Sequence, residues 1–337
     1  MPNYIVAKKM LQEVSMLFKK LKISFYTCCL SLILMITPLY AIDVVIGGES
    51  VGIILNYEGI CITGFYKIKI DQDLIDPSQY FEINDLITHV EKQEVKTIAD
   101  LTTVIKNSKN NTIEFTIKRN SKIYNRKMKI YKNNSEFSTG LYVKDCAKGI
   151  GTVTYYQINT GKFACLGHNM LENEFVIKNG SLYNTSIENI KRSETYQVGQ
   201  KIGNIDDKKI GIVEKNNDFG VYGKINQVPN KNIYKTASIN EIQLGDAYFL
   251  TVLRGNNIEK CKIKITNLLN QNEPKEKGIR FIVTDQNVIK QCNGIIQGMS
   301  GSPIIQNDKL IGCVTHASKS NTLEGYGMYI QWMIDNE

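Results

Sequence analysis

The sequence has few of the residues that build metal sites, redox motifs and nucleic-acid surfaces. Its 337 residues include only three histidines, His89, His168 and His316, and no H-E-x-x-H motif. None of the eight cysteines forms a C-x-x-C pair. The net charge of +8 is modest for this length, and no basic stripe with interleaved aromatic residues is present. We therefore expect no metal, no cofactor and no nucleic-acid partner.

Proline and glycine are also scarce, with 6 and 25 residues respectively, which excludes long flexible linkers. Hydrophobic residues make up 42% of the chain and charged residues 22%, as in ordinary globular proteins. At about 100–200 residues per domain, the length predicts two folded domains, or one large domain with additional segments.

The N-terminus carries a membrane signal. Residues 1–22 contain five lysines and a single glutamate, and residues 23–42 are mostly apolar and uncharged. Twenty apolar residues match the thickness of a bilayer, and the preceding lysines predict a cytoplasmic N-terminus. We expect a signal anchor with the body outside the cytoplasm. A cleavable signal peptide and a buried core helix are the alternatives.

The segment 43–132 begins with short β-branched runs, continues with a helical pattern over 97–106 and ends with two strands from residue 112. This order resembles a PDZ domain. The family's carboxylate-binding loop, x-Φ-G-Φ, is matched by Ser50, Val51, Gly52 and Ile53. The resemblance implies that their backbone N–H groups bind the terminal carboxylate of a peptide. The alternative is a PDZ-shaped spacer that binds no free terminus.

The segment 138–337 has many short β-branched or aromatic runs separated by turn signals, and few helical patterns. This is typical of an all-β barrel or sandwich, and its length allows two small barrels. Residues 329–334 predict a short closing helix.

The strongest chemical motif is Gly298-Met-Ser-Gly-Ser-Pro303, which is followed by a predicted hairpin. Glycines on both sides of Ser300 allow a tight turn that exposes its hydroxyl. The backbone N–H groups of Gly298 and Ser300 can then face a developing oxyanion. Chymotrypsin-like serine proteases have this arrangement, G-x-S-G-x-P before a β-hairpin. The alternatives are a plain Gly/Ser turn or, less consistent with the geometry, Ser302 as nucleophile.

A serine nucleophile needs a base, and His168 ends an apolar run 132 residues before Ser300. This is the chymotrypsin order of base before nucleophile. His316, after the hairpin, is the rival. For the acid that orients the base, Asp285 and Asp218 both remain open, and either could instead cap its own loop.

Together these features resemble the stage IV sporulation protein B (SpoIVB) serine peptidase family. The resemblance covers about residues 43–337. Besides the N-terminal span and the PDZ-like segment, it depends on Gly140–Thr152, Leu166–His168, Gly298–Pro303, Val314–His316 and Gly325–Met333. It implies Ser300, His168 and Asp285 as catalytic residues. Asn169 departs from the small residue expected after the histidine.

The resemblance further implies a serine endopeptidase of sporulation signalling, made in the forespore and exported toward the mother cell. Members cleave a regulatory subunit of an intramembrane protease complex, which leads to activation of a late sigma factor, and they also cleave themselves. Two other classes stay open: an HtrA-like quality-control protease, in which the PDZ domain follows the protease, and a non-catalytic PDZ scaffold.

Overall fold

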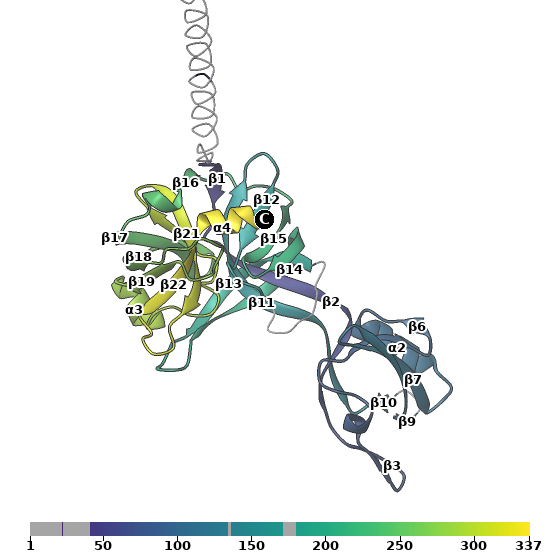
Figure 1. Ribbon diagram of the computed structural model, residues 1–337. Helices are drawn as coiled ribbons and strands as arrows, with labels where there is room; N and C mark the ends of the chain where they lie inside the picture. The colour runs from purple at the N-terminus through teal and green to yellow at the C-terminus, as the bar shows by residue number, and fades with distance from the viewer. Residues whose placement is uncertain (1–21, 23–40, 134–135, 171–179) are drawn as a thin grey trace, which may run out of the picture. The chain divides into compact units, whose positions relative to one another are not determined.

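The computed structural model describes Lys22 and residues 41–133, 136–170 and 180–337. The expected basic segment 1–22 and membrane span 23–42 therefore lie almost entirely outside the described residues. Within the described ranges, no helix combines the length and apolar character needed to cross a bilayer. The body is mainly β (Figure 1).

The first barrel is a closed ring of antiparallel strands in the order β2, β11, β12, β15, β14, β13 and back to β2. Its strands are β2 (Ser50–Phe65), β11 (Leu141–Gln157), β12 (Lys162–Cys165), β13 (Gly180–Lys191), β14 (Gln200–Asn217) and β15 (Gly220–Ile225). Its interior is filled by alternating apolar side chains, among them Ile53, Val153 and Phe163. Closure leaves no unpaired strand edge around the ring.

The second barrel closes in the same way, in the order β17, β18, β19, β22, β21, β20 and back to β17. Its strands are β17 (Gly245–Arg254), β18 (Asn257–Leu268), β19 (Ile279–Val283), β20 (Pro303–Gln306), β21 (Lys309–Ala317) and β22 (Glu324–Tyr329). Phe249, Phe281 and Tyr329 are among the largest side chains of its core. The predicted hairpin is β20–β21, which turns at Asn307 and Asp308 with φ of 50° and 57°.

A smaller lobe lies between β2 and β11 in the chain. Its main elements are the second half of β2, β5 (Leu86–Val90), β6 (Gln93–Glu94), α2 (Ile98–Asn107), β7 (Thr112–Arg119) and β8 (Lys122–Lys129). The predicted helix is confirmed: Thr97 caps it by accepting from the Asp100 N–H, and Asp100 completes the capping box. Leu101, Val104 and Ile105 face the core of the lobe.

The remaining elements are short. They are β1 (Asp43–Ile46), β3 (Ile68–Ile70), β4 (Asp73–Ile75), η1 (Pro77–Gln79), β9 (Tyr131–Asn133), β10 (Glu136–Ser138), β16 (Ile233–Thr236), η2 (Ile239–Glu241), α3 (Gln286–Cys292) and α4 (Ile330–Asp335). Side chains of α4 and β1 share an apolar cluster with strands of both barrels, including Val44, Tyr155, Met328 and Met333. This cluster packs the two barrels together.

The expected domain boundary is wrong at its N-terminal side. The strand β1 pairs with β11 and β16, and the first half of β2 pairs with β11 and β13. Residues from Asp43 to Leu55 therefore belong to the first barrel, and the smaller lobe is inserted after them. The chain completes this barrel only with strands that come after the lobe.

The interpretation of Ser50, Val51, Gly52 and Ile53 as a carboxylate-binding loop is also wrong. These residues form the start of β2, with β11 paired on one edge and β13 on the other, so their backbone is not open to a peptide. Gly52 serves packing: a Cβ there would lie 2.5 Å from Cγ2 of Ile205. Four residues of this pattern fit a buried strand as well as a binding loop.

Candidate active site

The turn that carries Ser300 is held by the first barrel. Gly298 and Gly301 flank it with φ of 94° and 88°, values that favour glycine. Thr152 of β11 binds the turn twice: its hydroxyl donates to the Gly298 carbonyl at 2.7 Å, and its N–H donates to the Ser300 carbonyl at 3.0 Å. The hydroxyl of Thr154 donates to the Gly301 carbonyl at 2.7 Å. The turn is therefore fixed by buried hydroxyls.

Two backbone donors of this turn are free. Among the described residues, neither the Gly298 N–H nor the Ser300 N–H donates a hydrogen bond, although the neighbouring N–H groups of Met299, Gly301 and Ser302 all do. Both Gly298 and Ser300 line a pocket of about 210 Å³. Unpaired N–H groups beside a serine hydroxyl suit an oxyanion hole.

His168 follows β12 on a turn in which Leu166 and Gly167 both have positive φ, 70° and 71°. Its Nδ1 lies 2.7 Å from the carbonyl oxygen of Asn169. A carbonyl oxygen only accepts, so Nδ1 carries a proton, and in the neutral ring the lone pair is then on Nε2. Asn216 of β14 fixes the same turn, because its amide donates to Asn169 Oδ1 at 2.8 Å and accepts from the Met170 N–H at 3.1 Å.

Ser300 and His168 lie in the same pocket, together with Ile53, Gly149, Ile150, Leu166, Met170, Gln297 and Gly298. Both side chains are half-buried, so a substrate can reach them. In this structure the Ser300 hydroxyl donates to the Thr315 carbonyl at 3.1 Å. Among the described residues, no hydrogen bond joins this hydroxyl to His168.

The rival histidine, His316, lies beside His168, with ring centroids 5.5 Å apart. Burial, followed by the charges of His168 and Lys277, lowers the pKa of His316 to about 4. Its Nε2 lies 3.6 Å from Oε2 of Glu276, and its Nδ1 is buried without a partner in the described chain. Burial raises the pKa of Glu276, and the charge of His168 opposes this shift in part. Glu276 had no sequence signal: it lies in a polar loop without any motif.

Asp285 and His168 share no hydrogen bond among the described residues. Asp285 is the N-cap of α3: its Oδ1 accepts from the N–H groups of Asn287 and Val288 at 2.9 and 3.3 Å, and its Oδ2 accepts from the Lys262 N–H at 3.2 Å. The carboxylate thus serves the backbone, as N-cap residues do. Asp218 lies at the exposed turn between β14 and β15, and its charge contributes to the raised pKa of Glu276.

Replacing Asp285 by asparagine should leave catalysis intact. Asparagine caps a helix as well as aspartate does, and Asp285→Ala should cost about 1 kcal/mol of unfolding free energy. An asparagine in place of a true triad aspartate lowers turnover about 10⁴-fold. Labelling rates with a fluorophosphonate, measured beside thermal unfolding, separate these outcomes. A large loss of rate in a stable Asp285→Asn variant would contradict the capping role.

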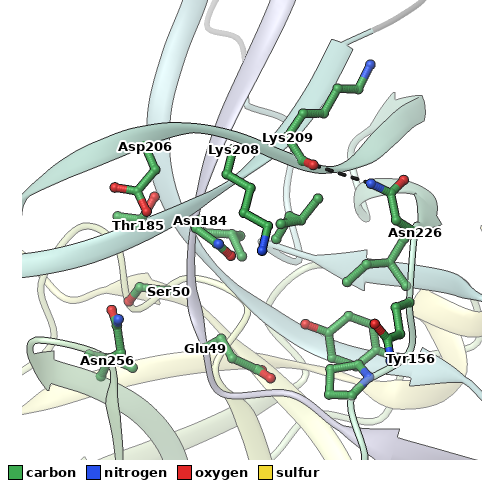
Figure 2. Close-up of a pocket in the computed structure, with 16 residues that line it drawn as sticks. Glu49, Ser50, Tyr156, Asn184, Thr185, Asp206, Lys208, Lys209, Asn226 and Asn256 are labelled. Carbon is green, nitrogen blue, oxygen red and sulfur yellow. Dashed lines mark hydrogen bonds between the residues drawn. The ribbon is translucent and has the colours of Figure 1, made fainter.

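A second cavity of about 450 Å³ lies elsewhere in the first barrel. Figure 2 shows its polar wall, with Glu49, Ser50, Asn184, Thr185 and Lys208 among the side chains that line it. Neither Ser300 nor His168 is part of this wall. Of these two pockets, the one of about 210 Å³ therefore contains the side chains that hydrolysis requires.

Paired barrels with a serine on a glycine-flanked turn, a histidine in the same pocket and free backbone donors define a serine peptidase. Residues 135–334 match the SpoIVB peptidase S55 family, and the chain belongs to it. The chain is thus a SpoIVB-type serine peptidase, as its sequence motifs predicted.

No curated protein sequence matches the chain significantly. Among solved structures, it is similar to the inactive form of the Rv3671c protease, with 15% identity and a TM-score of 0.33 over 56% of this chain and 81% of that one. A serine-to-alanine mutant of Rv3671c from M. tuberculosis H37Rv, also inactive, gives 12% identity and a TM-score of 0.31, and covers 56% and 78% of the two chains.

Proposed function

We propose that Ser300 is the nucleophile and His168 the general base of this peptidase. Ser300 attacks the scissile carbonyl carbon while Nε2 of His168 takes its proton, and the N–H groups of Gly298 and Ser300 bind the oxyanion. His168 then protonates the leaving amine, and water, activated by the same nitrogen, releases the acyl group. The observation that carries this proposal is that one pocket holds both side chains and the two free donors.

The imidazole is oriented without Asp285. The bond from Nδ1–H to the Asn169 carbonyl selects the tautomer that a base requires. Glu276 is close enough to interact electrostatically with His168, whose charge lowers the pKa of the Glu276 carboxyl. In this arrangement the Asn169 carbonyl and Glu276 together take the role of a triad acid.

The proposal is tested by replacing Ser300. The Ser300→Ala variant should lose fluorophosphonate labelling and casein cleavage completely and keep the thermal unfolding of the wild type, because the hydroxyl makes only one hydrogen bond in the described chain, to the Thr315 carbonyl. Ser302→Ala is the matched control: its buried hydroxyl has no hydrogen-bond partner in the described chain, so activity should persist. Labelling at Ser302, or cleavage by Ser300→Ala, would overturn the assignment.

We further propose the sporulation role that the family resemblance implies. The substrate is a membrane-bound regulatory protein of an intramembrane protease complex, in the space between forespore and mother cell, and the enzyme also cleaves itself near its N-terminus. A lysine-rich segment before an uncharged apolar run supports a membrane anchor with an extracytoplasmic body. The order of strands and helix in the smaller lobe supports a PDZ domain, placed before most of the peptidase rather than after it.

A further inference from the structure

Lys201, near the start of β14, is buried behind the nucleophile turn. Only 6% of the residue is exposed. Its Nζ lies 2.8 Å from the hydroxyl of Thr251, 3.0 Å from that of Ser50 and 3.4 Å from that of Thr152. Within the described residues, Lys201 has no salt bridge. Burying a charged lysine without a carboxylate partner costs free energy, so the place of Lys201 needs an explanation.

The surroundings of Lys201 match either protonation state. An ammonium has three N–H donors, one for each of the three hydroxyls, whereas a neutral amine donates two and accepts one. Burial lowers the pKa of Lys201 to about 7, and only the thiols of Cys292 and Cys261 oppose this shift. Of these three hydroxyl partners, only Ser50 lines the cavity of about 450 Å³ (Figure 2).

Lys201 connects to the oxyanion donors in two ways. The first is through Thr152. Its hydroxyl donates to the Gly298 carbonyl, and the same oxygen accepts a hydrogen bond from Lys201. The second is direct packing: a Cβ on Gly298 would lie 2.9 Å from Cδ of Lys201, so the lysine stem lies against the Gly298 backbone. The Lys201 N–H also donates to the Gln297 carbonyl at 2.9 Å.

We propose that Lys201 is a positioning residue, which sets the backbone of Gly298 and Ser300 through Thr152 and through its own stem so that their N–H groups meet the oxyanion. The proposal rests on the assignment of Ser300 as nucleophile. Oxyanion donors act only when they lie about 2.7–3.1 Å from the charged oxygen of the transition state. Loss of the Lys201 and Thr152 contacts to this backbone therefore slows the chemical step, whereas substrate binding in the ground state changes little.

The experiment measures covalent labelling of the full chain by a fluorophosphonate, with the first-order rate constant and the half-saturating concentration obtained separately. Lys201→Met keeps the stem and removes the donors, and Thr152→Val removes the hydroxyl. Each should lower the rate constant about 10–100-fold and leave the half-saturating concentration within about twofold. Thr152→Ser should recover most of the rate. The double variant should be no slower than the slower single one, because both act through one contact.

Thr251→Val is the matched control, because Thr251 contacts Lys201 without a hydrogen bond to the turn. It should stay within about threefold of the wild-type rate. Wild-type labelling of a stable Lys201→Met variant would overturn the proposal, as would an equal loss in Thr251→Val or a change confined to half-saturation. If Lys201→Met does not fold, a Thr152→Val variant with the wild-type rate overturns it instead. A wild type that is neither labelled nor active refutes the nucleophile assignment itself.

Discussion

Replacement of His168 by alanine should lower peptidase turnover about 10⁶-fold while the protein stays folded. The side chain is half-buried, and its one hydrogen bond among the described residues joins it to the neighbouring Asn169, so its removal disturbs little structure. What it removes is the proposed base, whose ring lines the same pocket as Ser300. Casein cleavage and fluorophosphonate labelling measure the loss, and circular dichroism checks the fold.

His316→Ala is the comparison that decides which histidine is the base. Its pKa of about 4 keeps His316 neutral at physiological pH, and its Nε2 faces Glu276 rather than a free hydroxyl. We expect a loss of activity below about tenfold, through the shifted surroundings of His168. The reverse ranking of the two variants would make His316 the base.

Gly301→Ala should have the largest effect on stability. A Cβ at this position would lie 2.0 Å from the Thr152 carbonyl oxygen and 2.4 Å from the Leu166 nitrogen, both backbone atoms that cannot turn aside. The φ of 88° adds strain for any side chain. We expect a loss of more than about 3 kcal/mol in unfolding free energy by urea titration, or failure to fold, together with loss of labelling at Ser300.

Gly255→Ala isolates the contribution of strain alone. Gly255 also has a positive φ, 58°, but a Cβ there would meet nothing within 4 Å. Its replacement should cost about 1 kcal/mol and leave activity unchanged. Equal losses at the two positions would mean that close packing at Gly301 contributes nothing.

The sequence predicted the parts of the site that are local. The glycines around Ser300 need positive φ, the hairpin after Pro303 needs its Asn-Asp turn, and the capped helix begins at Thr97 as its pattern indicates. Each of these depends on neighbours a few residues apart. Short-range rules therefore predicted the glycine-flanked turn at Ser300 and the β character of the body.

What the sequence missed depends on contacts between distant residues. Asp285 has the right spacing for an acid, but its own helix uses the carboxylate. Lys201 stands in an ordinary polar run, and only folding brings it to Thr152, 49 positions away. Glycine is needed at position 52 because Ile205 packs against it, and no local pattern predicts that the strand of Ile205 lies there. Such partners follow from how the barrel closes.

The placement of β1 sets a limit on proteolytic maturation. A cut before Asp43 would release the body with every barrel strand in place. A cut after Leu55 would leave β11 and β13 facing each other across a missing neighbour, with their polar backbones open to water. Any active, shed form of this enzyme must therefore keep the stretch from Asp43 to Leu55. A peptidase that began at residue 138 would lack the strand between β11 and β13, so its first barrel could not close.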